Sequence, residues 1–144
     1  MAVKIWMENK VFLDTSFAIA LSVESDAHHK TAIKLSEQLE SEQTNLITTT
    51  AILLEIGNAL SKKRYRQAAV LLLDSLEQDQ TVEIIAIDDE LYRQAFELFR
   101  NRPDKDWGLV DCISFIVMQE RGMFEVLTAD EHFEQAGFRA LLRS

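Results

Sequence analysis

The chain has 144 residues, of which 47% are hydrophobic and 27% charged, and its formal net charge at pH 7 is −9. This length and composition predict one globular domain over residues 1–144. The negative charge disfavours non-specific adhesion to nucleic acid, but it leaves room for a nucleic-acid enzyme if a bound metal inverts the local field. The single cysteine cannot form an internal disulfide, and the sequence lacks an export signal or a membrane-spanning apolar run. We therefore expect a soluble, cytoplasmic protein.

Strand-like and helix-like segments alternate along the chain. In chain order we expect a strand over 11–16, helices over 17–23 and 28–43, a strand over 45–49, helices over 50–63 and 65–78 and a strand over 82–87. A helix over 88–100 follows, then a helix that starts at 107 or 109 and ends at 121, a strand over 124–129, a helix over 131–136 and a last edge strand over 138–142. This alternation predicts a parallel sheet with helices on both faces, joined by right-handed crossovers.

Several residues mark where these elements begin or end. Asp88 is the expected N-cap of the helix after the third strand, and Gly122 and Gly137 are expected just beyond two helix ends. Pro103 stops any helix that reaches it. Lys62-Lys63-Arg64 is expected at the C-terminus of the helix over 50–63, where cations suit the helix dipole.

The first strand ends in the run Lys10-Val11-Phe12-Leu13-Asp14-Thr15-Ser16, in which a carboxylate is followed by two hydroxyl residues. Ligand crevices of parallel sheets lie outside the carboxyl ends of the strands, so Asp14 is expected at such a crevice. An ionised carboxylate there is costly unless it is paired, hydrogen-bonded or bound to a metal.

Further acids are predicted to point toward the same crevice. Asp130 follows the fourth strand, Glu55 lies at the edge of the buried stripe of its helix, and Asp111 lies in the first turns of the most apolar helix. Carboxylate oxygens are the ligands that Mg²⁺ and Mn²⁺ prefer, and carboxylate clusters with one or two such ions cleave phosphodiesters. These acids therefore predict a divalent-metal site.

Each acid also has a purely structural interpretation. Asp14 and Asp130 could cap the helices that follow them, and Asp111 could only favour its helix dipole. Glu55 could pair with a nearby lysine or arginine.

Two other acids serve as comparisons. Asp88 follows an apolar strand as Asp14 does, but its strand is expected at the sheet edge, so it should only cap a helix. Asp106 stays open between the N-cap of the following helix and a fifth member of the cluster.

Four stretches together resemble the PIN-domain family, and the resemblance covers nearly the whole chain. They are Val11-Phe12-Leu13-Asp14-Thr15-Ser16, Glu55 in its helix, Asp106-Trp107-Gly108-Leu109-Val110-Asp111-Cys112-Ile113-Ser114, and Leu127-Thr128-Ala129-Asp130-Glu131-His132-Phe133 followed by Ala136-Gly137-Phe138. The resemblance implies an α/β protein, a three-layer α/β/α sandwich whose central parallel sheet has about five strands in the order 3-2-1-4-5.

The same resemblance implies a metal-dependent ribonuclease similar to the VapC toxins of bacterial toxin–antitoxin pairs. Its cofactor would be Mg²⁺ or Mn²⁺, its substrate single-stranded RNA, and its protein partner a cognate antitoxin. Asp14, Glu55, Asp111 and Asp130 carry over as an acidic quartet. Asp14 and Asp111 would be the main metal ligands, while Glu55 and Asp130 would complete the coordination or orient the water that the ion activates. Glu131 is the alternative to Asp130.

Other functions were weighed against this one. A catalytically idle PIN-like scaffold that only binds a partner and a non-toxin RNA-processing nuclease both stay open. An aspartyl phosphotransfer enzyme is disfavoured because the position two residues after Asp14 is Ser16, and a receiver-type signalling domain because Asp14 has no adjacent acid.

The helix over 65–78 contains the run Val70-Leu71-Leu72-Leu73, which is more apolar surface than one buried stripe uses. Surplus apolar surface marks an interface, and VapC-like proteins are commonly homodimers. We expect a homodimer with Leu71 or Leu72 at its interface; the alternative is that this helix is sandwiched inside the monomer.

Overall fold

The sheet has the strand order that the resemblance implies. The computed structural model describes residues 9–143, so the ends of the predicted domain, residues 1–8 and 144, lie outside the described residues. Within that range, parallel strands form one sheet in the order β3-β2-β1-β4-β5. The strands are β1 (Lys10–Leu13), β2 (Asn45–Thr49), β3 (Val82–Ile85), β4 (Glu125–Leu127) and β5 (Arg139–Ala140). The expected order is confirmed, with β3 and β5 at the edges.

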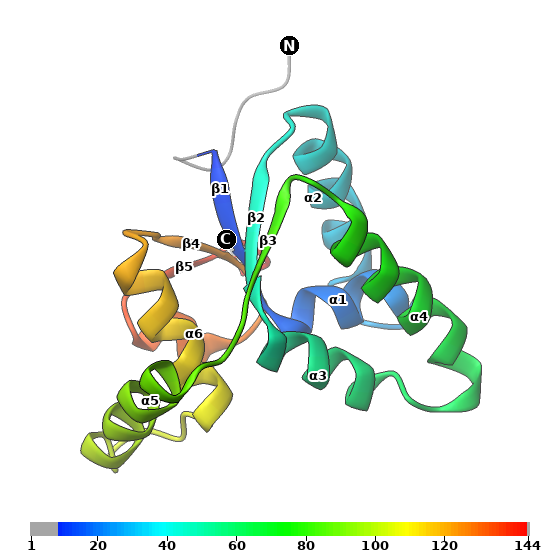
Figure 1. The fold of residues 1–144 in the computed structure, drawn as a ribbon. Coiled ribbons are helices and arrows are strands. Elements are labelled where there is room, and N and C mark those ends of the chain that lie inside the picture. Colours follow the sequence, from blue (N-terminus) through cyan, green and yellow to red (C-terminus); the bar gives the residue numbers. More distant parts are fainter. Residues whose placement is uncertain (1–8, 144) are drawn as a thin grey trace.

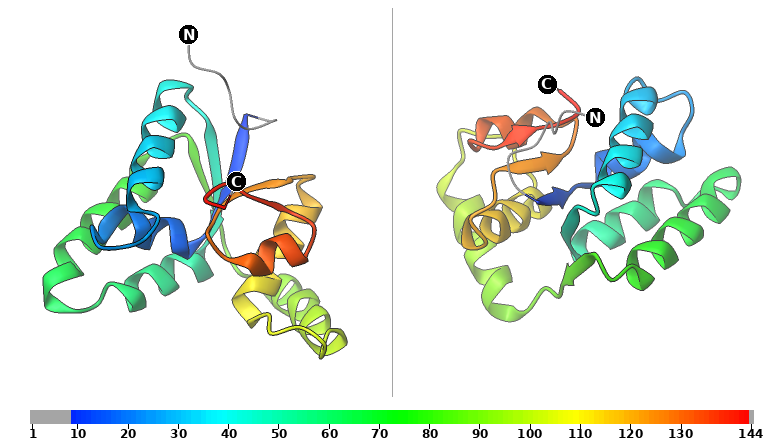
Figure 2. Two further views of the ribbon diagram at one scale, coloured as in Figure 1. Left: turned by 180° about the vertical axis from the view of Figure 1, so that it is seen from behind. Right: turned by 90° about the horizontal axis from the view of Figure 1, so that it is seen from above.

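Helices cover both faces of the sheet and complete a three-layer α/β/α sandwich (Figure 1). The helices on one side are α1 (Thr15–Ser22), α2 (His29–Ser41), α3 (Thr50–Ala59) and α4 (Lys63–Gln78), and those on the other are α5 (Asp89–Asn101), α6 (Leu109–Glu120) and α7 (Glu131–Gln135). Figure 2 shows the same division from behind and from above. None of the helices within residues 9–143 is long and apolar enough to cross a membrane.

The neighbouring inner strands β1 and β4 are apolar on both faces because both faces are covered. Val11, Phe12 and Leu13 of β1 are at most 3% exposed, and Val126 and Leu127 of β4 are fully buried. The register pairs Leu13 with Leu127. The residues that follow these two strands therefore lie side by side at the carboxyl edge of the sheet.

Most predicted element boundaries are confirmed. The side chain of Asp88 accepts a hydrogen bond from the Leu91 N–H at 2.8 Å and so caps α5. Gly122 and Gly137 have φ angles of 62° and 96°, the left-handed conformation that glycine favours just beyond a helix end. The first strand is shorter than predicted, because α1 already begins at Thr15 and Asp14 lies between the two elements.

The prediction for the end of α3 is wrong. That helix ends at Ala59, and Lys62 is the N-cap residue of α4, so the basic run lies at the positive pole of a helix dipole and not at the negative pole of one. Arg66 offsets part of this unfavourable placement of the basic run. Its guanidinium donates two hydrogen bonds to the Ser61 carbonyl, at 3.1 Å and 2.8 Å, and so stabilises the turn that separates the two helices.

A buried ion pair joins the last two strands. Arg139 on β5 lies opposite Glu125 on β4 and donates to its carboxylate at 2.8 Å, while the Glu125 side chain is only 2% exposed. We predict that Arg139→Ala lowers the free energy of unfolding by about 3 kcal/mol, because it removes a cation that is bonded to a buried carboxylate. Urea denaturation measures this loss.

Arg121→Ala is the matched control for this prediction. Its ion pair with Glu83 is of similar geometry, but both side chains are about half exposed, so the loss should stay below about 1 kcal/mol. Equal losses in the two variants would contradict the importance of burial.

Candidate active site

Asp14 occupies the N-cap position of α1, but its side chain makes no capping hydrogen bond. It is 6% exposed, and its Oδ2 atom instead accepts hydrogen bonds from Thr128 Oγ1 at 2.7 Å and from Ser16 Oγ at 3.2 Å. The capping interpretation is therefore wrong for Asp14. The carboxylate is turned toward the end of β4.

Hydroxyl groups tie the ends of β1 and β4 together beneath this carboxylate. Ser16 Oγ and Thr128 Oγ1 are hydrogen-bonded to each other at 2.9 Å. Ser16 Oγ also accepts from the Ala129 N–H at 2.9 Å, and Thr128 Oγ1 accepts from the Asp130 N–H at 3.0 Å. Sequence reasoning missed Thr128. The pairing of Leu13 with Leu127 places it opposite Asp14, but that register becomes visible only once β1 and β4 are known to be neighbours.

Glu55 approaches the same edge from α3. It is half-buried, and its Oε1 atom accepts a hydrogen bond from Thr15 Oγ1 at 2.7 Å. Among residues 9–143, no lysine or arginine forms an ion pair with Glu55, so its pairing with a cation is not observed. The hydroxyl residues after Asp14 thus hold two acids, Asp14 itself and Glu55.

Asp111 and Asp130 are brought together by a histidine. Asp111 Oδ2 accepts from the Gly108 N–H at 3.0 Å, and it lies 3.1 Å from His132 Nδ1. The same ring nitrogen lies 3.3 Å from Asp130 Oδ1. Asp130 also caps α7, since its side chain accepts from the His132 N–H at 2.9 Å. Its structural interpretation is therefore confirmed, although its carboxylate still faces Asp111.

These three side chains could hold a metal ion. Ligand atoms of Asp111, Asp130 and His132 all lie within 4.8 Å of one another. Carboxylate oxygens suit Mg²⁺ and Mn²⁺, and an imidazole nitrogen is a common ligand of transition metals. His132 was missed by the sequence reasoning, although it stands two residues after a candidate ligand at the start of a helix.

Electrostatic repulsion links the two halves of the site. The pKa of Asp14 is raised to about 6, mainly by burial, against which the hydrogen bonds from Thr128 and Thr15 act; the negative charges of Asp111 and Glu55 contribute to the same rise. Burial and the charge of Asp130 likewise raise the pKa of Asp111. All four predicted acids therefore interact at one edge of the sheet. Within residues 9–143, none of them forms an ion pair with a lysine or arginine.

Neither comparison acid belongs to the group of Asp111, Asp130 and His132. Asp106 is exposed, and α6 begins after Gly108, so Asp106 is not the N-cap of that helix. Asp88 caps α5 after the edge strand β3. Glu131, the alternative to Asp130, is exposed.

A model of the PIN-domain family matches residues 11–139. This span contains all four acids and every strand except the first residue of β1 and the last residue of β5. The chain belongs to the PIN-domain family.

Curated members of the same family are similar along most of the chain. The chain is 30% identical over 128 residues to the 23S rRNA-specific endonuclease VapC20 of Mycobacterium tuberculosis, in both strain CDC 1551 / Oshkosh and strain H37Rv. The match covers 89% of this chain and 95% of VapC20.

Solved structures agree with the observed fold. The crystal structure of Mycobacterium tuberculosis VapC20, a Sarcin-Ricin loop cleaving toxin, superposes with a TM-score of 0.79 at 29% identity and covers 89% of this chain and 95% of its own. VapBC2 from Rickettsia felis, bound to a promoter DNA fragment, superposes with a TM-score of 0.63 at 13% identity over 91% of this chain and 96% of its own. The second likeness concerns the fold alone.

The raised pKa of Asp14 predicts how stability depends on pH in this PIN domain without metal. The pKa rises from 3.8 to about 6 on folding, so the stabilisation from the protonated carboxyl is present below pH 3.8 and lost as pH rises through 6. Asp14→Asn keeps an uncharged group there. In EDTA at pH 8 it should raise the free energy of unfolding by about 2 kcal/mol, and this gain should vanish near pH 4.

Thermal or urea unfolding across this pH range measures the effect. Asp88→Asn is the control, because asparagine caps a helix about as well as aspartate and no such pH-dependent gain is expected. A loss of stability in Asp14→Asn at pH 8 would contradict the prediction.

Proposed function

We propose that this PIN-domain protein is a metal-dependent endoribonuclease of the VapC type, which hydrolyses RNA phosphodiesters. The observation that carries the proposal is the convergence of Asp14, Glu55, Asp111 and Asp130 at the carboxyl edge of the sheet, where no lysine or arginine of residues 9–143 forms an ion pair with them. Such a cluster is suited to a divalent cation. The similarity to VapC20, a 23S rRNA-specific endonuclease, supports RNA as the substrate.

The protein's own groups are arranged to hold these acids still. Thr128 and Ser16 orient Asp14, Thr15 orients Glu55, and the Gly108 N–H and His132 orient Asp111. A bound Mg²⁺ or Mn²⁺ would supply positive charge to the reacting phosphate and lower the pKa of the attacking water. In this proposal Asp14 and Asp111 are the main ligands, and Glu55 and Asp130 complete the coordination or orient that water.

Amide substitutions test the assignment of the acids. We expect Asp14→Asn and Asp111→Asn each to slow cleavage at least about 100-fold. Each substitution removes a negative charge from the cation site and keeps the size and shape of the side chain. The measurement is cleavage of 23S rRNA, and of a panel of other structured RNAs, with Mg²⁺, with Mn²⁺ and with EDTA.

Asp88→Asn is the matched control and should keep activity within about twofold, because Asp88 follows an apolar strand as Asp14 does but lies at the sheet edge. Activity retained in both Asp14→Asn and Asp111→Asn would overturn the assignment. Cleavage that persists in EDTA would overturn the metal dependence.

The protein partner in this proposal is a cognate antitoxin, since VapC20 is described as a toxin. A non-toxin processing nuclease is the second candidate, because the site chemistry is the same for both. The neighbouring gene distinguishes them: a small upstream reading frame that encodes a DNA-binding protein favours the toxin, and an isolated gene favours the processing nuclease.

The protein is also proposed to be a homodimer, and exposed leucines support this. Leu71 on α4 is 60% exposed and Val70 is 47% exposed, while Leu54 on the neighbouring helix α3 is 71% exposed. Leu72, in contrast, packs against the core. Leu71 is thus the better interface candidate of the two leucines named from the sequence.

Leu71→Glu should convert the dimer to a monomer at micromolar concentration, because a charge placed in an apolar interface is costly to bury. Sedimentation equilibrium gives the mass. Phe124→Glu, at a 42% exposed position between α6 and β4, is the control and should stay dimeric. A monomeric wild type, or a dimer in Leu71→Glu, would contradict this prediction.

A further inference from the structure

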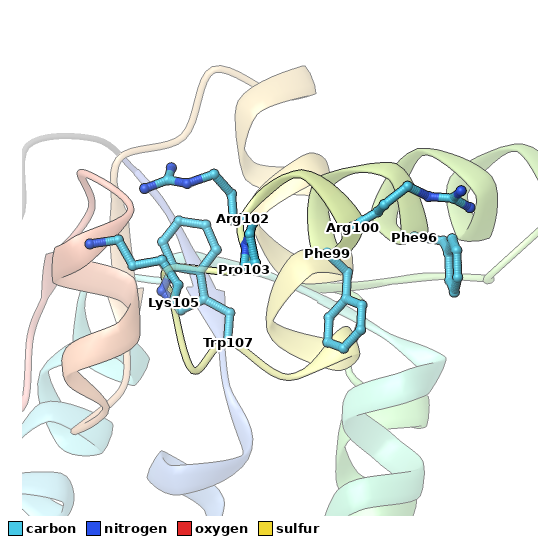
Figure 3. A pocket seen from close by; sticks show the side chains of 7 residues that line it. All are labelled: Phe96, Phe99, Arg100, Arg102, Pro103, Lys105 and Trp107. Carbon is cyan, nitrogen blue, oxygen red and sulfur yellow. The ribbon is translucent and has the colours of Figure 1, made fainter.

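A cleft of about 460 Å³ lies beside α5, lined by aromatic and basic side chains. Its lining residues are Phe96, Phe99, Arg100, Arg102, Pro103, Lys105 and Trp107 (Figure 3). Arg100 lies beside Phe96 at one end of the cleft, Arg102 and Lys105 lie beside Trp107 at the other, and the ring of Phe99 is between them. Both arginines lie over aromatic rings. The guanidinium carbon is 4.9 Å from the ring centroid for Arg100 over Phe96 and also for Arg102 over Trp107.

The charge of this cleft is opposite to that of the chain. The chain carries −9 overall, but none of the described residues that line the cleft is acidic. Arg102 is bonded to Asp104 through two contacts of 3.0 Å, so its charge is balanced. Arg100 only approaches Glu97 at 3.9 Å, and both side chains are more than half exposed, which makes that pair weak. Lys105 forms no ion pair within residues 9–143, although its charge also acts on Asp104. Arg100 and Lys105 are therefore the cations of the cleft that are best able to attract an anion.

The cleft also offers an open aromatic face. Phe99 is 45% exposed, which is unusual for so large an apolar side chain. Trp107 forms a rigid wall, since it is 6% exposed and packs edge-on against Phe115 with ring centroids 5.0 Å apart. Aromatic rings with arginines beside them are the surface on which unpaired bases stack while the cations contact phosphates. A volume of about 460 Å³ lies within the usual range of small-ligand sites.

One wall of the cleft contacts the elements that carry Asp111 and Asp130. Trp107 Nε1 donates a hydrogen bond to Gln135 on α7 at 3.0 Å, and α7 begins right after Asp130. The residue after Trp107 is Gly108, whose N–H holds Asp111. One wall of the cleft and the N–H that holds Asp111 therefore belong to one short segment, Trp107-Gly108.

We propose that this cleft binds an unpaired base of the RNA substrate, stacked on Phe99, with Arg100 and Lys105 contacting the adjoining phosphates. The inference rests on the proposed nuclease function and adds to it a specific site for a single-stranded nucleotide flanking the cleaved bond. It selects RNA whose bases are unpaired near that bond, because a paired base cannot reach Phe99.

The test compares two fluorescein-labelled probes by fluorescence anisotropy, with Ca²⁺ in place of Mg²⁺ and with intact probe verified on a gel. One probe is a single-stranded adenosine decamer, and the other is an abasic decamer with the same phosphates and no bases. Phe99→Leu should weaken binding of the adenosine decamer about tenfold and leave the abasic decamer unchanged. Arg100→Gln should weaken both and lower the slope of log K against log salt by about 0.7, the value for one phosphate contact on a single strand.

Matched controls lie on the same helix outside the cleft. Tyr92→Leu removes a ring that is 49% exposed, and Arg93→Gln removes an exposed arginine that is loosely paired with Glu90 at 3.6 Å. Both should bind the two probes within about twofold of the wild type. Phe99→Trp keeps an aromatic face and should retain binding, which separates lost stacking from disturbed folding, and thermal melting verifies each variant.

The outcomes also separate this inference from the nuclease proposal. If wild-type protein cleaves RNA but Phe99→Leu and Arg100→Gln bind like Tyr92→Leu and Arg93→Gln, the cleft assignment fails and the nuclease stands. Equal losses for both probes in Phe99→Leu would show that no base stacks there and would also overturn it. If the wild type neither binds nor cleaves RNA, both proposals fail.

Discussion

Mutual repulsion of carboxylates at the carboxyl edge of a parallel sheet is the constraint on which the rest of this PIN domain depends. Asp14 is almost fully buried, its pKa is raised to about 6, and the acids nearby add to the cost of ionising it. A fold gains no stability from such an arrangement. Buried acids of one charge persist where a positive ligand offsets their repulsion, which is why this destabilising cluster is also the candidate active site.

Short side chains make that arrangement tolerable. Thr15, Ser16 and Thr128 bond two of the acids without introducing a positive charge, so the carboxylates keep their orientation and remain available to a cation. A lysine in the same place would neutralise these acids and, in the proposed function, compete with the divalent cation. The hydroxyl network therefore resolves the conflict between holding an acid still and leaving it unneutralised.

The acidic cluster and the cleft beside α5 divide the tasks of a nuclease in the proposed function. An acidic surface repels a polyanion, and the net charge of −9 offers no general attraction. Contacts with RNA then depend on a bound cation at the cluster and on local positive groups such as Arg100 and Lys105. Because these groups alternate with aromatic rings, the substrate is held through its bases as well as its phosphates, which favours unpaired segments.

The sequence by itself determined the strand order, most helix ends and the acids that meet, because apolar periodicity, capping residues and the family motifs are local or ordered signals. It misplaced the end of α3, since Leu60, Ser61 and Lys62 carry no glycine or proline to mark the break. Only the tertiary structure decided that Asp14 faces Thr128 rather than capping α1, and that His132 joins Asp111 to Asp130. Thr128 is 114 positions from Asp14 in the sequence, and His132 is 21 positions from Asp111. Such contacts depend on strand register and helix packing, which no local pattern encodes.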